Sequence, residues 1–189
     1  SLTSVVIPEG VKKIGSLAFL GCTSLTSVVI PSSVTELEKS AFSGCTSLTS
    51  IVVAEGNSVY DSREGCNAII ESATNKLIKG SNSTIIPSSV TAIGCVAFRG
   101  CTSLTSIEIP SSVTEIGGST FWGCTSLTSI VIPKGVTAIG NFAFSGCSSI
   151  TSIAIPSSVT AIGYLTFSNC TSLTSVVIPE GVTEIGGGA

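Results

Sequence analysis

The chain has 189 residues, a length that suits one domain, and 43% of them are hydrophobic while only 10% are charged. Its formal net charge of −3 gives no basic footprint for nucleic acid, and no apolar run approaches the roughly 18 residues of a membrane-spanning helix. Histidine is absent, so the common nucleophile–base pairs of enzymes are missing.

The chain repeats itself with a period of 23 residues. Pro8 and Pro31 are one period apart, as are Cys22 and Cys45. Near-copies of "GCTSLTSVVIP" at 21–31 stand at 100–110, 123–133, 146–156 and 169–179. A fixed period of about 20 to 29 residues with a Leu-x-x-apolar-x-apolar pattern is typical of leucine-rich repeats, whose coils stack into a solenoid.

Residues 25–47 indicate how one coil folds. The alternation at 27–30 predicts a short strand with one buried face, and Pro31 ends it because proline cannot donate to a continuing ladder. The β-branched setting of 34–37 predicts a second short extended segment. Residues 41–42 are expected on a single helical turn, and a glycine then allows a tight corner.

Stacked coils would bury about eight apolar side chains each and form a parallel sheet along one face. The sequence therefore predicts a right-handed, mainly β leucine-rich-repeat solenoid of about eight coils. Short strands and single helical turns are expected on its other side. The chain begins with "SLTSVVIP" and ends with "VTEIGGGA", both partway through a repeat, so we expect residues 1–189 to be one solenoid segment of a longer protein.

Most of the eight cysteines keep the repeat period. The members of this ladder are Cys22, Cys45, Cys101, Cys124, Cys147 and Cys170. We expect a stack of buried thiols that bond to backbone groups at the coil corner, because parallel Cβ vectors suit adjacent disulfides poorly. No Cys-x-x-Cys motif occurs, so no metal is expected. Cys66 and Cys95 lie off the ladder, and a disulfide between them is a further possibility.

One repeat, at residues 54–83, is lengthened by ten residues to a period of 33. Its two apolar runs, "NAIIE" and "KLIKG", predict a β-hairpin. The insert is either a binding protrusion or an alternative coil that only changes the curvature. Tyr60 and Arg63 are its candidate binding residues.

The open sheet face supplies the other candidates. Rows of Ser, Thr and Val run along it, and Glu108 replaces the valine of its row. Ser106, Glu108, Ser129 and Val131 are the candidate binding residues of this face. The rows fit a shallow protein-docking surface, or they are β-formers maintained by repeat duplication without any ligand. Trp122 takes a corner position that other coils fill with smaller side chains, so it is either an anchor or an incidental surface aromatic.

The combination "IPSSVTEIG…TFWGCTSLTSI" closely resembles the BspA-like leucine-rich repeats of bacterial and protist surface proteins, and the resemblance covers the whole chain. The insert looks like the longer repeat variant of such arrays. The resemblance implies a secreted or cell-surface protein linked to adhesion, and it carries over no catalytic residue and no cofactor.

A non-enzymatic adhesion or protein–protein interaction module is the leading prediction. Its ligand would be a protein or glycan on host matrix or on other cells, at the cell surface or outside the cell. A self-assembling scaffold that builds a filament or surface coat is the alternative. The close carboxylate pair Glu36 and Glu38, and the pair Asp61 and Glu64, are interpreted as solvated charges because charged side chains are mostly exposed.

Overall fold

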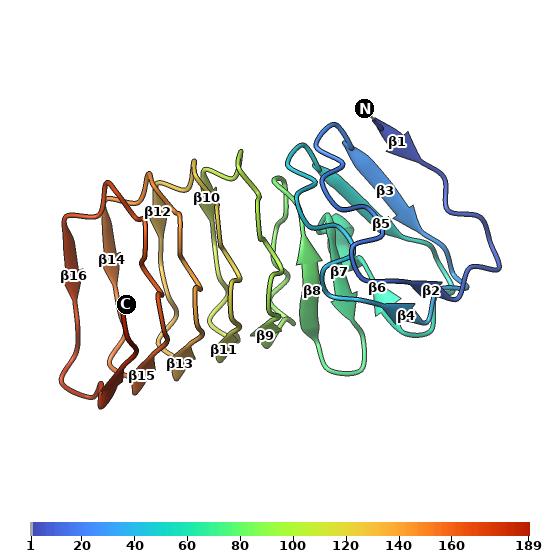
Figure 1. Ribbon diagram of the computed structural model, residues 1–189. Helices are drawn as coiled ribbons and strands as arrows, with labels where there is room; N and C mark the ends of the chain where they lie inside the picture. Colours follow the sequence, from blue (N-terminus) through green and yellow to red (C-terminus); the bar gives the residue numbers. More distant parts are fainter. Residues whose placement is uncertain (1) are drawn as a thin grey trace.

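The computed structural model describes residues 2–189, which form a mainly β solenoid of about eight turns (Figure 1). The predicted fold class is confirmed. Seven strands in residues 2–189 begin with serine and line one side, which we call the serine face, whereas residues 81–86 reach this side without a strand. Its strands are β1 (Ser4–Val5), β3 (Ser27–Ile30), β5 (Ser50–Val53), β10 (Ser106–Ile107), β12 (Ser129–Ile130), β14 (Ser152–Ala154) and β16 (Ser175–Val177).

A second short strand follows where the β-branched segments predicted it. These strands are β2 (Lys13–Ile14), β4 (Glu36–Leu37), β9 (Ala92–Ile93), β11 (Glu115–Ile116), β13 (Ala138–Ile139), β15 (Ala161–Ile162) and β17 (Glu184–Ile185). Both sets pair in parallel, and partners are one period apart, for example Ser27 with Ser50 and Ile116 with Ile139. Identical positions therefore stack on each other, which explains why the same residues recur.

The core fills the space between the two sets of strands. In β3 the side chains alternate exposed and buried, and Val28 and Ile30 point inward. Phenylalanine rings stack almost parallel from coil to coil: the Phe98 and Phe121 centroids are 5.2 Å apart, and the Phe121 and Phe144 centroids are 5.4 Å apart. The stack removes large apolar areas from water, which a single coil could not do alone.

The single helical turn predicted after the second strand is wrong. Residues 94–101 form consecutive hydrogen-bonded turns instead, and alternate N–H groups point at the neighbouring coil. The Phe98 N–H donates to the Thr120 carbonyl at 2.9 Å, and the Gly100 N–H donates to the Trp122 carbonyl at 2.8 Å. Val96 has φ of 57°, which a right-handed helix excludes. The backbone at this corner therefore joins coils rather than winding into a helix.

The lengthened repeat contains β6 (Tyr60–Asp61), the short 3-10 helix η1 (Arg63–Gly65), β7 (Ala68–Glu71) and β8 (Lys76–Gly80). The segment predicted to form a hairpin consists of β7 and β8, which pair antiparallel. β8 also pairs in parallel with β9, so the hairpin belongs to an eight-stranded sheet of order β17-β15-β13-β11-β9-β8-β7-β6. The insert is thus built into the wall of the solenoid.

The lengthened coil omits the corner that carries Phe and Cys in the other coils. Gly80 lies directly against the Phe98 ring, where a β-carbon would come within 2.1 Å of a ring carbon. Ser81, in the position that a leucine takes in other coils, is fully buried and donates through its hydroxyl to the Thr49 carbonyl.

Residues 2–189 contain no helix with the length and hydropathy of a membrane span.

Candidate functional site

The serine face is open to solvent along its length in the part of the chain that the structure describes. Its outward apolar side chains are strongly exposed, with Val6 at 89%, Val131 at 79% and Ile85 at 75%. Ile85 precedes Glu108 by one period and lies directly after the lengthened repeat at 54–83. The sequence reasoning missed it, although stepping back 23 residues from Glu108 would have identified it.

Glu108 lies at the centre of a shallow groove on this face. One hollow of about 530 Å³ is lined by Ile85, Ile107, Glu108 and neighbouring residues. An adjoining hollow of about 440 Å³ shares Ser106 and Glu108 and adds Ser129 and Val131. The structure therefore brings together the candidates that the sequence predicted for this face: Ser106, Glu108, Ser129 and Val131.

Hydrogen bonding separates the serine row from the threonine row beside it. The Thr128 hydroxyl donates to the Thr105 carbonyl at 3.1 Å, and the Thr49 hydroxyl donates to the Thr26 carbonyl at 3.3 Å. Threonine hydroxyls are thus used to join coils. The hydroxyls of Ser106 and Ser129 form no hydrogen bond with any residue of 2–189, so they are available to a ligand.

The two candidates in the insert have structural contacts and do not reach the groove. Tyr60 is buried, and its hydroxyl accepts the backbone N–H of Leu37 at 3.1 Å. Arg63 is half-buried and pairs with Asp61, and its guanidinium also donates to the side-chain carbonyl of Asn75 at 2.9 Å. The Arg63 hydrogen bond holds the pKa of Asp61 below its ordinary value. These contacts join β6 to the turn of the hairpin.

Trp122 lies apart from the groove, at a corner of the coil. Its side chain is 40% exposed, and the Arg99 guanidinium carbon lies 4.4 Å from the centroid of its ring. Arg99 takes the equivalent position in the preceding coil. The two side chains form a cation–π contact on the surface.

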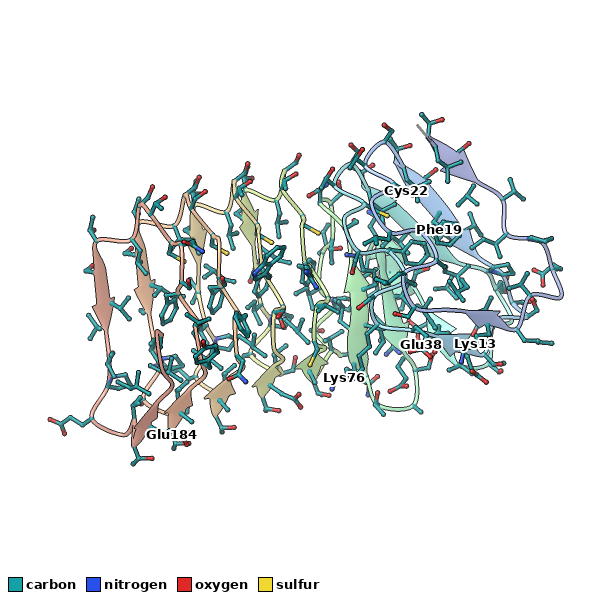
Figure 2. All side chains as sticks on the ribbon, viewed as in Figure 1. Lys13, Phe19, Cys22, Glu38, Lys76 and Glu184 are labelled. Atoms are coloured by element: carbon teal, nitrogen blue, oxygen red, sulfur yellow. The ribbon has the colours of Figure 1, made fainter. Side chains whose placement is uncertain are left out.

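The ladder thiols donate to the backbone of the preceding coil. The Cys124 Sγ–H donates to the Phe98 carbonyl at 3.2 Å, and the Cys147 Sγ–H donates to the Phe121 carbonyl at 3.1 Å. Burial raises the pKa of Cys147 to about 12, so this thiol stays protonated and unreactive at neutral pH. Figure 2 shows Cys22, the first member, near the edge opposite Lys13 and Glu38.

The structure does not contain the Cys66–Cys95 disulfide, and all eight cysteines are free thiols. Cys66 is buried, and its thiol donates to the nearby carbonyl of Ala68 at 3.7 Å, whereas Cys95 is half-buried. Within residues 2–189, no group of three or more acidic, cysteine or histidine side chains could hold a metal ion.

The close carboxylates form ion pairs along the opposite edge of the solenoid. Lys13 contacts Glu36 at 3.0 Å and Glu38 at 3.4 Å, and Lys76 contacts Glu115 at 3.6 Å. Figure 2 shows Lys13, Glu38, Lys76 and Glu184 along this edge. Exposed pairs of this kind contribute little to stability.

The coil length, the stacked strands and the phenylalanine and cysteine ladders define a leucine-rich-repeat solenoid. The chain belongs to the BspA type leucine rich repeat family, whose model matches residues 1–75 and 70–189 with six copies. Proteins of the leucine-rich-repeat class are generally protein-interaction or surface proteins, and they are typically non-enzymatic binding scaffolds.

Solved structures agree with this assignment. A leucine rich cell surface protein from Faecalibacterium prausnitzii matches with a TM-score of 0.80 and 28% identity over 100% of this chain and 60% of its own. A leucine-rich repeat protein from Eubacterium ventriosum matches with a TM-score of 0.80 and 26% identity over 95% of this chain and 53% of its own. The leucine rich repeat protein of T. pallidum matches with a TM-score of 0.58 and 30% identity over 97% of this chain and 73% of its own.

The chain spans 60% and 53% of the length of the first two of these structures. No curated protein matches the sequence.

Proposed function

We propose that this chain is a non-enzymatic adhesion module of an extracellular or cell-surface protein, and that it binds a protein or glycan ligand on host matrix or other cells through the serine face. One observation carries the proposal. The groove around Glu108 combines free serine hydroxyls, exposed apolar side chains and one carboxylate without any covering element in residues 2–189. Flat, partly apolar faces of solenoids are suited to protein docking.

Glu108 makes this groove different from the rest of the face. Equivalent positions elsewhere carry Val29, Val52, Val131 and Val177, so Glu108 interrupts an otherwise apolar row. A carboxylate among apolar groups favours a ligand that presents a cation or hydrogen-bond donor between apolar contacts. The similarity to a protein described as a cell surface protein supports the proposed location.

The test is a binding screen of the chain against immobilised matrix proteins and glycans, followed by surface plasmon resonance on each hit. Glu108→Val restores the residue of the other coils and should weaken binding about tenfold or more if the carboxylate contacts the ligand. Glu115→Val changes the same charge on the second strand of the same coil and should leave the affinity unchanged. If both variants weaken binding equally, or if neither variant changes the affinity, binding through the serine face would be contradicted.

Sedimentation velocity over a wide concentration range tests the alternative function. The adhesion module should sediment as an elongated monomer. Concentration-dependent fibres or sheets would instead support a self-assembling scaffold, with the serine face as a contact between copies.

A further inference from the structure

A second surface combines an unpaired cation with exposed apolar groups. The Arg99 guanidinium carbon lies over the ring of Trp122, the only tryptophan of the chain, 4.4 Å from its centroid. A cation–π contact of this kind does not use up the N–H donors of the guanidinium. Within residues 2–189 the Arg99 side chain forms no ion pair and donates no hydrogen bond. Arg99 is therefore held in place by stacking and still has its full capacity to bind an anion.

The groove beside this stack has a volume of about 350 Å³. Leu17 and Leu20, which are 49% and 57% exposed, form its apolar part, together with Trp122. These residues are far apart in the sequence, and the lengthened repeat brings them together. Because that repeat omits the corner, a β-carbon added to Gly100 would lie only 3.9 Å from the Cα of Gly44. Side chains of the first coils thus share one hollow with those of the later coils.

The inner side of the same corner carries another positive charge. Lys79 is only 5% exposed and forms no ion pair within residues 2–189. Its charge lowers the pKa of Cys45 and Cys101, although burial raises both overall. These cysteines directly follow Gly44 and Gly100, which line the groove. No carboxylate lines the groove, and Arg99 is the charged side chain of its lining, which favours an anionic ligand.

We propose that this corner groove binds a peptide segment of a partner protein in which a carboxylate neighbours an apolar side chain. The carboxylate accepts a bidentate pair of hydrogen bonds from Arg99. The apolar side chain packs on Leu17 and Leu20. The lining residues of this groove are separate from those of the groove on the serine face, so the inference stands independently of the function proposed for that face.

The groove favours a peptide over an acidic glycan. Sugar rings often stack on an open aromatic face, but the guanidinium of Arg99 already lies over the ring of Trp122. The remaining apolar groups are the aliphatic side chains of Leu17 and Leu20, which suit aliphatic or aromatic side chains of a protein.

Trp122 gives a direct readout, since its fluorescence comes from the groove alone. The probes are the peptide acetyl-Gly-Asp-Leu-Gly-amide, its Asn-Leu analogue and 3′-sialyllactose, each titrated with fluorescence and with calorimetry. The Asp-Leu peptide should change the fluorescence saturably and bind more weakly at high salt, and the neutral analogue should not bind. Arg99→Ser should weaken the binding measured by calorimetry about tenfold or more.

Two controls separate binding from folding. Serine already occupies the same position in other coils, at Ser43, Ser145 and Ser168, so Arg99→Ser should keep the melting temperature of the parent chain. Lys12→Ser removes an exposed cation outside the groove and should leave the affinity unchanged. The absence of a saturable response to the Asp-Leu peptide would overturn the proposal. Equal binding by Arg99→Ser, or a response to 3′-sialyllactose alone, would overturn it as well.

Discussion

The regular coils after Leu104 and the lengthened coil at 54–83 are stabilised in different ways. In the regular coils each residue packs on its own copy one period away, so rings, thiols and threonines form ladders. The lengthened coil has no such copies. It is held by single contacts: the Tyr60 hydroxyl on the Leu37 N–H, the Arg63–Asp61 pair and the fit of Gly80 to Phe98. The regular region is stabilised by contacts that recur in every coil, whereas the insert is stabilised by contacts that occur once.

The largest expected effect comes from a substitution at the centre of the phenylalanine ladder in the regular coils. Phe121 is fully buried between Phe98 and Phe144. Phe121→Ala should lower the free energy of unfolding by about 3–5 kcal/mol, because it removes a buried ring and leaves a cavity. Phe19→Ala is the control, since Phe19 is only half-buried and stacks on Phe42 alone among the described residues. Urea denaturation followed by circular dichroism measures both, and equal losses would contradict the ladder account.

A methyl group added at Gly80 tests the insert. Its β-carbon would lie 2.1 Å from a carbon of the buried Phe98 ring, so Gly80→Ala should cost about 2–3 kcal/mol through overpacking. Gly123→Ala is the matched change in a regular coil. Gly123 has φ of +72° but no atom within 4 Å of the added carbon, so only the backbone strain of about 1 kcal/mol is expected. A larger loss for Gly123→Ala would reverse the comparison.

Alkaline pH should weaken the thiol ladder. Burial raises the pKa of Cys45 to about 11 and that of Cys147 to about 12, above the ordinary value of 9.0. A raised folded pKa gives stability that is complete below the unfolded pKa and is lost as pH rises toward the folded pKa. Each such thiol should therefore lower the free energy of unfolding by about 1.4 kcal/mol per pH unit between about pH 9 and its folded pKa.

Urea titrations at a series of pH values measure this slope. The double variant Cys45→Ser, Cys147→Ser is the control, because a hydroxyl can donate to the same carbonyls. The free energy of unfolding of the variant should fall less steeply with pH, by the amount that these two thiols contribute in the parent chain. An identical slope would contradict a contribution of these thiols to the pH dependence.

The sequence predicted the regular coils well because their pattern is periodic. Val28 and Ile30 were identified as inward-facing from alternation, and the second strand was identified from β-branched residues. The helical turn was wrong, because local propensity around Phe98 does not reveal that alternate N–H groups bond to the next coil. The burial of Tyr60 was also missed. Its partner, the Leu37 N–H, lies one period of 23 residues earlier in the preceding coil, so counting back one period from Tyr60 would have indicated an inward position.

The residues of the groove around Glu108 were partly predictable from the sequence. Ser106, Glu108, Ser129 and Val131 share a face by simple alternation, and the structure brings them together. Ile85 was missed because the row was not continued one period back from Glu108, past the lengthened repeat. The corner groove could not be predicted, since it exists only because the omitted corner lets Gly100 approach Gly44.

The most direct test of the proposed binding face uses two exposed positions of one coil. Val131 lies on the serine face, and Ala138 lies on the second strand of the same coil. Each is replaced by arginine, and the affinity for a matrix ligand from the screen is measured by surface plasmon resonance. The account predicts that Val131→Arg weakens binding at least about tenfold while Ala138→Arg leaves it unchanged. Loss of binding only in Ala138→Arg would contradict it.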